Sequence, residues 1–231
     1  MNVLDVAPEL KRARADPGAA SIVARYLGRT VLAVGAHPDD IELGVGGTMA
    51  LLSRAGVRVV MAIVSVPANY EIRAAEARDS AAILGSELRI LVQGACQRME
   101  DMKSYQLVGL LDALVRELRP AAVLTHGPTD FHQDHVTLYH AMLSSQRLAP
   151  FDLYSYVPTM TRPVPVRFEP NAYVDISSTI EAKLQAIAAH RSQFHARALP
   201  FEFYRDMARL NGRVVGVDYA EALAVNKLVF A

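Results

Sequence analysis

The run Thr30-Val31-Leu32-Ala33-Val34-Gly35 is almost continuously apolar, and Ala36-His37-Pro38-Asp39-Asp40-Ile41-Glu42 follows it directly. An apolar run of this length is typical of a strand that is buried on both faces of a parallel sheet. The residues behind it place one imidazole and two adjacent carboxylates where the chain must turn. Pro38 has a fixed φ and biases His37 towards an extended conformation, which stiffens that turn. The stretch predicts a central strand that ends in a rigid polar loop.

The rest of the chain alternates between further apolar strands and amphipathic helices. Strands are expected over residues 57–64, 88–92 and 121–125, and helices over 44–55, 72–84, 104–118 and 135–147. After Pro150 the pattern loosens, and we expect strands over 153–157, 163–168 and 172–175 and a helix over 176–194. The alternation predicts an α/β fold, a Rossmann-like, mostly parallel open sheet with helices on both faces and a small C-terminal strand and helix elaboration. We predict one domain over residues 1–231, with its core at about 30–195.

The composition limits the classes of function. With 52% hydrophobic residues in 231, the chain can bury a large core without a disulfide or a structural metal. The 24 basic residues balance the 24 acidic ones, so binding to nucleic acid by bulk charge is not expected. Cys96 is the only cysteine, which excludes a Cys-rich zinc site. We find no apolar membrane span and no signal peptide, and we expect a cytoplasmic protein.

A second polar cluster, His132-Gln133-Asp134-His135, follows the strand expected over 121–125. In an open α/β sheet the ligand site lies outside the carboxyl ends of the strands, where the strand order reverses. In the common order 3-2-1-4, the first and fourth strands flank that point. The two clusters are therefore expected to meet, although they are far apart in the sequence.

Together the clusters offer the ligands of a catalytic metal. Such a zinc ion takes three protein ligands and leaves one position open. His37, Asp40 and His135 would supply two nitrogens and one oxygen. A bound divalent ion lowers the pKa of water and polarises a carbonyl, as metal-assisted hydrolysis requires.

The remaining side chains suit acid–base catalysis, which typically raises the reaction rate about 10²–10⁴-fold. Asp39 is the candidate general base, because it is adjacent to a ligand and points elsewhere. His132 is the candidate acid or oxyanion partner, and we expect Asp134 to orient its ring. Whether Asp39 or His132 protonates the leaving amine stays open.

These motifs resemble those of the PIG-L/LmbE-like deacetylase superfamily. His37-Pro38-Asp39-Asp40 with Gly46-Gly47-Thr48 is similar to its N-terminal signature, and His132-x-Asp134-His135 to its second motif. The likeness continues through Arg73-x-x-Glu76, Leu84-Gly85, Asp175-Ile176, Lys183, His190-x-Ser192-Gln193 and Tyr219-Ala220-Glu221. It covers residues 30–222 approximately.

The resemblance implies a zinc-dependent N-deacetylase with a Rossmann-like fold that acts on N-acetylglucosamine conjugates or amino-sugar antibiotic intermediates. By motif position, the family's metal ligands fall on His37, Asp40 and His135, its general base on Asp39, its second catalytic pair on His132 and Asp134, and a sugar contact on Arg73. One departure is the short loop 67–70, which lacks the Gly-rich run that usually precedes the arginine.

We therefore expect a zinc enzyme, with Fe²⁺ as the alternative ion, that removes an N-acetyl or similar N-acyl group from a small amino-sugar-containing substrate. Such a reaction would serve cofactor-thiol or secondary-metabolite biosynthesis. Self-association into a homo-oligomer stays open. The alternatives are a thiol-conjugate amidase or carbamoyl hydrolase of the same fold, or a non-catalytic binding module.

Plainer interpretations exist for several of these residues. Carboxylates near residue 40 also suit the N-terminus of a helix, where each stabilises the helix by about 0.3–1 kcal/mol through its dipole. Asp134 could cap the helix that follows it. Arg73 and Glu76 lie one helical turn apart, so a salt bridge competes with a substrate contact.

Other polar residues receive different expectations. Asp130 lies on the loop before His132 and is a candidate substrate contact. His126 and His140 are expected to be structural. His190, with Gln193, is expected to brace the C-terminal helix against the core.

Overall fold

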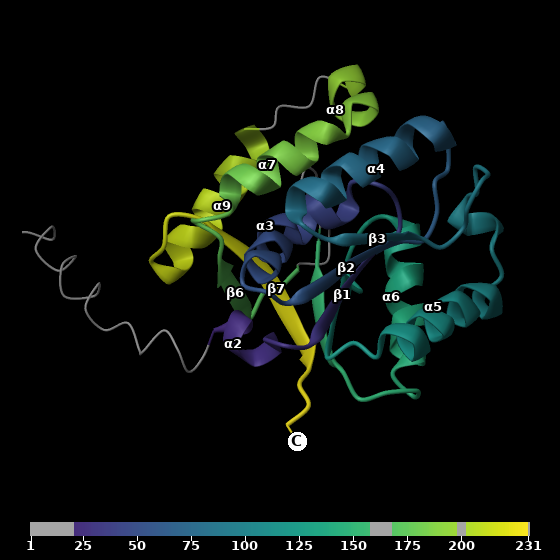
Figure 1. The fold of residues 1–231 in the computed structure, drawn as a ribbon, viewed down its shortest axis with the longest axis horizontal. Helices are drawn as coiled ribbons and strands as arrows, with labels where there is room; N and C mark the ends of the chain where they lie inside the picture. Colours follow the sequence, from purple (N-terminus) through teal and green to yellow (C-terminus); the bar gives the residue numbers. More distant parts are fainter. Residues whose placement is uncertain (1–20, 158–167, 198–201, 231) are drawn as a thin grey trace, which may run out of the picture.

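The strands of the protein form one mixed sheet. In a computed structural model, which describes residues 21–157, 168–197 and 202–230, the strands lie in the order β3-β2-β1-β4-β5-β7-β6 (Figure 1). Their bounds are β1 Thr30–Gly35, β2 Arg58–Ile63, β3 Glu87–Ile90, β4 Ala122–His126, β5 Asp152–Tyr156, β6 Ala172–Asp175 and β7 Ala220–Lys227. The first five strands are parallel, whereas β7 runs antiparallel to both β5 and β6. This confirms the predicted α/β class and the order 3-2-1-4.

Helices cover both faces of the sheet. Their bounds are α2 Ile22–Tyr26, α3 Asp40–Arg54, α4 Tyr70–Leu84, α5 Ser104–Leu118, α6 Gln133–Ser145, α7 Ile180–Ala189, α8 Arg191–Arg197 and α9 Glu202–Val215, with a 3₁₀ turn at Met99–Asp101. Helices α5 and α6 lie on one face, and α3, α4 and α7 lie on the other (Figure 1). Within the described residues, no helix is long and apolar enough to span a membrane.

Strand β1 is buried on both faces because its alternate side chains pack into two separate hydrophobic cores. Val31 and Ala33 pack on the side of α3 and α7. Leu32 and Val34 pack on the side of α5 and α6. All four side chains are fully buried, which explains why the strand is apolar at successive positions rather than alternating.

Two glycines let other elements approach α3 closely. A Cβ atom at Gly47 would lie 2.7 Å from Cδ1 of Ile176, and one at Gly44 would collide with the ring of Tyr156. Tyr156 is fully buried, and its hydroxyl donates to the carbonyl of Val34 at 2.9 Å. The small residues after the HPDD motif therefore pack α3 against β5 and the C-terminal region.

The differences from the predicted elements are concentrated at helix ends and in the C-terminal region. Helix α3 begins at Asp40 rather than at residue 44, and the helix expected over 176–194 is divided at His190 into α7 and α8. The strand expected over 163–168 lies, apart from its last residue, outside the described residues. Helix α9 and strand β7 were not predicted.

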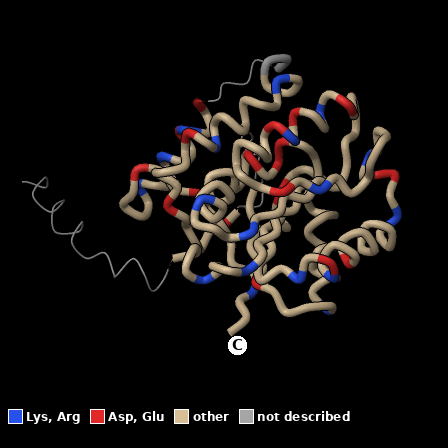
Figure 2. The backbone as a smooth tube through the Cα atoms, in the orientation of Figure 1, with Lys and Arg blue, Asp and Glu red and all other residues tan. Residues whose placement is uncertain are grey.

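The charged residues are distributed as the composition suggests. Basic and acidic positions are interspersed along the backbone in Figure 2, in keeping with 24 of each in the sequence. The polar clusters of interest lie instead at the carboxyl ends of β1 and β4, which are neighbours in the sheet.

Candidate active site

The turn from β1 into α3 holds Asp39 in an unusual backbone conformation. Its φ of 98° and ψ of −29° lie on the left-handed side of the Ramachandran map. Such a conformation costs a non-glycine residue about 1–3 kcal/mol and tends to occur at functional sites. Asp39 occupies the N-cap position of α3, yet its side chain makes no capping hydrogen bond. Helix capping therefore does not account for this carboxylate.

Arg73 of α4 supports this turn from behind. Its Nη2 donates to the carbonyl of Pro38 at 2.9 Å and lies 3.9 Å from Oδ2 of Asp39. Glu76 accepts hydrogen bonds from the backbone N–H and the hydroxyl of Ser192, both at 2.7 Å. The Arg73 side chain is only 8% exposed, so it holds the loop rather than presenting a free guanidinium to a sugar.

Asp39 is tuned towards proton transfer near neutral pH. Burial and the neighbouring Asp40 carboxylate raise the pKa of Asp39 to about 7, against the opposing effects of His190 and Arg73. A general base is most effective when its pKa lies near the working pH.

Asp40 lies at the centre of the cluster. Its Oδ2 accepts the backbone N–H of His37 at 2.8 Å, and its Oδ1 lies 3.3 Å from Nε2 of His135. Burial opposes its charge, but the neighbouring His135 outweighs burial and holds the pKa of Asp40 well below its usual range. Asp40 is therefore an ionised carboxylate in a buried position.

His135 has the surroundings of a metal-binding imidazole. Its Nδ1 bonds to Oδ2 of Asp130 at 2.7 Å, while its Nε2 is buried and has no hydrogen-bond partner among the described residues. Burial disfavours the charged ring, but Asp40 and Asp130 outweigh that effect and raise the pKa of His135 to about 10. The same two carboxylates would favour a metal cation on Nε2 in place of that proton. Carboxylates behind ligand imidazoles commonly fix their orientation in this way.

Asp130 does not lie where a substrate contact was expected. Its side chain is completely buried, and its second oxygen accepts the backbone N–H of His132 at 3.0 Å. A carboxylate without exposed surface cannot touch a substrate. Asp130 instead orients the imidazole of His135 and holds the backbone at His132.

The pairing of Asp134 also differs from the expectation. Its carboxylate bonds to Nε2 of His37 at 2.9 Å, and its backbone N–H donates to Nδ1 of His132 at 3.2 Å. The structure thus pairs Asp134 with the imidazole of the first cluster, and the backbone of α6 orients the ring of His132. The ring of His132 stacks on His135 with centroids 4.5 Å apart, and residue 132 is exposed.

Among the residues that the structure describes, two overlapping groups of side chains could each hold a metal ion. The ligand atoms of His37, His132 and His135 lie within 4.8 Å of one another, and so do those of Asp40, His126 and His135. The predicted ligands His37, Asp40 and His135 are divided between these groups. They are close neighbours, because Nδ1 of His37 lies 3.6 Å from Oδ2 of Asp40.

His126 is unsuited to be a ligand, although it belongs to the second group. Its Nε2 accepts the backbone N–H of Ala36 at 3.0 Å, which occupies that lone pair. The ring stacks on His135 at 3.8 Å, and burial together with His135 lowers the pKa of His126 to about 4. His126 is a neutral brace that ties the end of β4 to the loop after β1. The sequence suggested a structural role but not the contact with Asp40, at 3.3 Å.

A further buried pair supports α3 from the other side. His190, between α7 and α8, lies with Nε2 2.9 Å from Oε1 of Glu42, and the hydroxyl of Ser80 donates to the same oxygen. His190 thus braces the C-terminal helices against the core, as expected. Burial disfavours charge on the His190 ring, but Glu42 outweighs it and raises the pKa of His190.

The comparisons with known proteins show the family of this chain. Residues 32–145 match the family described as PIG-L, GlcNAc-PI de-N-acetylase. A probable N-acetyl-alpha-D-glucosaminyl L-malate deacetylase 2 from Bacillus cereus is 30% identical over 190 residues, which cover 73% of this chain and 85% of that protein. The chain belongs to the PIG-L family. The resemblance inferred from the two motifs is therefore confirmed.

Other members and structural neighbours extend the PIG-L comparison. Diacetylchitobiose deacetylase from Thermococcus kodakarensis is 27% identical over 222 residues, covering 84% of this chain and 82% of that protein. The crystal structure of TT1542 from Thermus thermophilus has a TM-score of 0.71 and 27% identity, covering 88% of this chain and 97% of that chain.

One neighbour with the same fold bears the name of a different enzyme. GalB, the 4-carboxy-2-hydroxymuconate hydratase from Pseudomonas putida, also has a TM-score of 0.71, with 20% identity over 88% of this chain and 98% of that chain. At this identity the likeness shows the fold alone. The reaction of this PIG-L family member must therefore be argued from its site.

Proposed function

We propose that this chain is a metal-dependent hydrolase that removes the N-acetyl group from an amino-sugar-containing substrate. The names of its relatives support this reaction, since they include deacetylases of N-acetylglucosaminyl malate and of diacetylchitobiose. The buried Nε2 of His135 is the observation that carries the proposal. This nitrogen has no hydrogen-bond partner among the described residues and lies 3.3 Å from Oδ1 of the ionised Asp40, in a ring that stacks on the exposed His132.

We assign His37, Asp40 and His135 as the residues that would hold the ion. Two imidazole nitrogens and one carboxylate oxygen are a donor set of catalytic zinc sites, and the same set also suits Fe²⁺. When bound, such an ion would polarise the amide carbonyl and lower the pKa of a water molecule. We favour zinc as the resident ion.

Asp39 is the proposed general base. Its side chain is mostly buried. The turn and the neighbouring Arg73 restrict the position of its carboxylate. Holding an acceptor in place before reaction is what makes positioned acid–base catalysis effective. The proton taken from water by Asp39 is then available for the leaving amine.

His132 is the proposed partner for the developing oxyanion. The Asp134 backbone N–H occupies its Nδ1, which leaves Nε2 to carry a proton towards the substrate. The exposure of residue 132 gives a substrate access to this ring. In our proposal Asp134 acts by orienting His37, and Asp130 by orienting His135.

We further propose a small N-acetylated amino sugar as the substrate, with the enzyme acting in the cytoplasm as a single domain. The balance of charge along the chain, visible in Figure 2, does not favour nucleic acid as a partner.

A panel of N-acylated compounds tests the proposed reaction. The purified protein, loaded with zinc or Fe²⁺, is assayed for acetate release from N-acetylglucosamine conjugates, carbamoylated sugars and thiol-conjugate amides. We expect acetate release from the N-acetylated sugars, its loss on chelation and its return with added metal. Exclusive turnover of another amide would establish the amidase alternative. No turnover of any amide, with no metal bound, would refute the proposal.

A further inference from the structure

Helix α3 is interrupted directly after the turn that carries the candidate metal ligand Asp40. Val45 has φ −138° and ψ 18°, which are not helical values, although helix continues on both sides. Breaks of this kind have identifiable causes, and a side chain inserted between backbone donors and acceptors is one of them. Here the cause is a buried ion pair.

Lys183 and Glu221 fill the break. In a regular helix the N–H of Gly47 would donate to the carbonyl of Leu43. In this structure the N–H of Gly47 donates to Oε1 of Glu221 at 2.9 Å, and the carbonyl of Leu43 accepts from Nζ of Lys183 at 2.8 Å. Lys183 and the same Oε1 of Glu221 are 2.6 Å apart. The ion pair thus bridges the donor and acceptor of one helical hydrogen bond.

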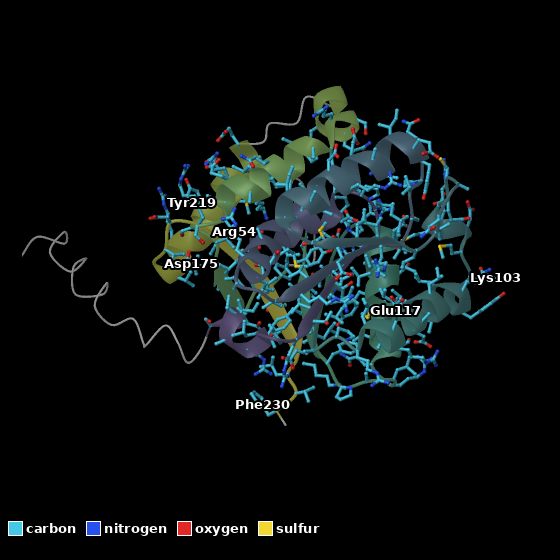
Figure 3. All side chains as sticks on the ribbon, in the orientation of Figure 1. Arg54, Lys103, Glu117, Asp175, Tyr219 and Phe230 are labelled. Atoms are coloured by element: carbon cyan, nitrogen blue, oxygen red, sulfur yellow. The ribbon has the colours of Figure 1, made fainter. Side chains whose placement is uncertain are left out.

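Further contacts tie this bridge to distant parts of the chain. The other oxygen of Glu221 accepts from the N–H of Thr48 at 2.7 Å and from its hydroxyl at 2.6 Å. Thr179, at the start of α7, donates its hydroxyl to the carbonyl of Gly47 at 2.8 Å. The break is therefore held from α7, which carries Lys183, and from β7, which carries Glu221. Figure 3 labels Tyr219, two residues before Glu221 in the chain, and Asp175, which pairs with Ala220 across β6 and β7.

Burial makes this arrangement energetically demanding. The side chains of Lys183 and Glu221 are only 4% and 3% exposed. Removing two charges from water costs several kcal/mol per ion, and such pairs are weak contributors to stability compared with apolar packing. A role in fixing a particular geometry accounts for their presence better than stability does.

The geometry that the pair fixes is that of the metal site. The short segment between the turn and the break, Asp40–Gly44, is the part of α3 whose direction the break sets. That segment carries Asp40, which contacts His37 and His135, and Glu42, which contacts His190. A change in the break would rotate Asp40 relative to the imidazoles on the neighbouring elements.

We propose that Lys183 and Glu221 are positioning residues that set the first turn of α3 so that Asp40 can share a metal ion with His37 and His135. This inference rests on the proposed function, because it requires that the site binds a metal. The pair acts through the backbone of residues 43–48, which it contacts directly.

The test compares Glu221→Gln with a matched control. Glu221→Gln keeps the shape of the side chain but removes its charge. The control is Asp152→Asn, another buried carboxylate that accepts several hydrogen bonds, from Arg25, Tyr26 and the backbone of Val229. Asp152 lies at the amino end of β5, whereas the candidate metal site lies at the carboxyl ends of the parallel strands, and it is near Phe230 at the C-terminal end (Figure 3).

Metal affinity and the cobalt spectrum are the two readouts. The zinc dissociation constant is measured by competition with a chromophoric chelator, and the visible absorption of the Co²⁺-loaded protein reports its coordination. We expect Glu221→Gln to weaken zinc binding about 10–100-fold, as for other residues that orient ligands, and to change the cobalt bands. Asp152→Asn should change the dissociation constant less than about threefold at a comparable loss of thermal stability.

The outcomes separate the two claims. If the wild-type protein binds no zinc or cobalt, the proposed function fails. If the wild type binds metal and Glu221→Gln matches it in affinity and spectrum, or if the control weakens binding equally, only the positioning role is refuted. Thr48→Val, which removes one hydrogen bond to Glu221 and keeps the ion pair, serves if Glu221→Gln does not fold. We expect it to weaken zinc binding about 3–10-fold, and wild-type affinity in that variant would refute the role.

Discussion

Replacing Asp39 by Asn removes the proposed proton acceptor and keeps the size and shape of the side chain. Asn is, like Asp, one of the residues that most readily adopt left-handed conformations, so the turn at φ 98° should be preserved. The nearest cation, Nη2 of Arg73, lies 3.9 Å away and keeps its own hydrogen bond to Pro38. Because burial and the Asp40 carboxylate disfavour a charge on Asp39, we expect the removal of that charge to raise the free energy of unfolding near neutral pH rather than to lower it.

The catalytic loss in Asp39→Asn should be large. A positioned general base contributes about 10²–10⁴-fold, which corresponds to a barrier increase of about 2.7–5.4 kcal/mol. The assay is kcat for acetate release at saturating metal, with metal content measured on the same samples. Asp39→Gly is the companion variant, since glycine also accepts the positive φ and also lacks the carboxylate. A metal-loaded Asp39→Asn protein with kcat within about threefold of the wild type would refute the base assignment, since that assignment requires a loss of at least 10²-fold.

Three further predictions concern the support of the site and of the fold. Asp130→Asn should weaken metal binding about 10–100-fold by loosening the ligand imidazole, and unchanged affinity in a chelator competition would contradict this. Gly44→Ala should lower the free energy of unfolding in urea by about 1–3 kcal/mol, because the new methyl group meets the buried ring of Tyr156, and an equally stable variant would disprove that close contact. Burial opposes charge on Asp152, but hydrogen bonds from Arg25 and others hold the pKa of Asp152 below its usual range. Its contribution to stability should therefore be complete above its unfolded pKa of about 3.9 and be lost as pH falls below it, so that wild type and Asp152→Asn converge in acid unfolding experiments; a constant difference would contradict this.

The sequence contains enough information for the parallel core. The apolar run at residues 30–35 and the stripe over 104–118 correspond to β1 and α5 without a shift of either boundary. Strong periodicity and burial on both faces leave little choice of structure there. Once the order 3-2-1-4 is assumed, the meeting of the two polar clusters follows from topology alone.

The C-terminal region could not be predicted in the same way. Strand β7 lies between β5 and β6 although it follows both in the sequence, and no local pattern specifies such an antiparallel insertion. The boundary between α7 and α8 lies at His190, whose ring contacts Glu42, a residue far away in the sequence. The break in α3 likewise depends on Lys183 and Glu221, which come from other elements.

The two motifs predicted that their side chains would lie close together, but not which side chain would contact which. Asp134 lies beside His132 in sequence, but in space its carboxylate reaches His37. Asp130 looked like an exposed loop residue, yet its side chain turns inward to His135. Side-chain direction depends on rotamers and packing, which spacing in the sequence does not encode.

Metal stoichiometry in a pair of histidine variants tests the central claim most directly. His135→Ala removes the proposed ligand with the buried free nitrogen, and His140→Ala removes an exposed histidine from the same helix. Elemental analysis of proteins purified without chelator should find about one zinc or iron ion per chain in the wild type and in His140→Ala, and almost none in His135→Ala. Wild-type metal content in His135→Ala would contradict the assignment of this site.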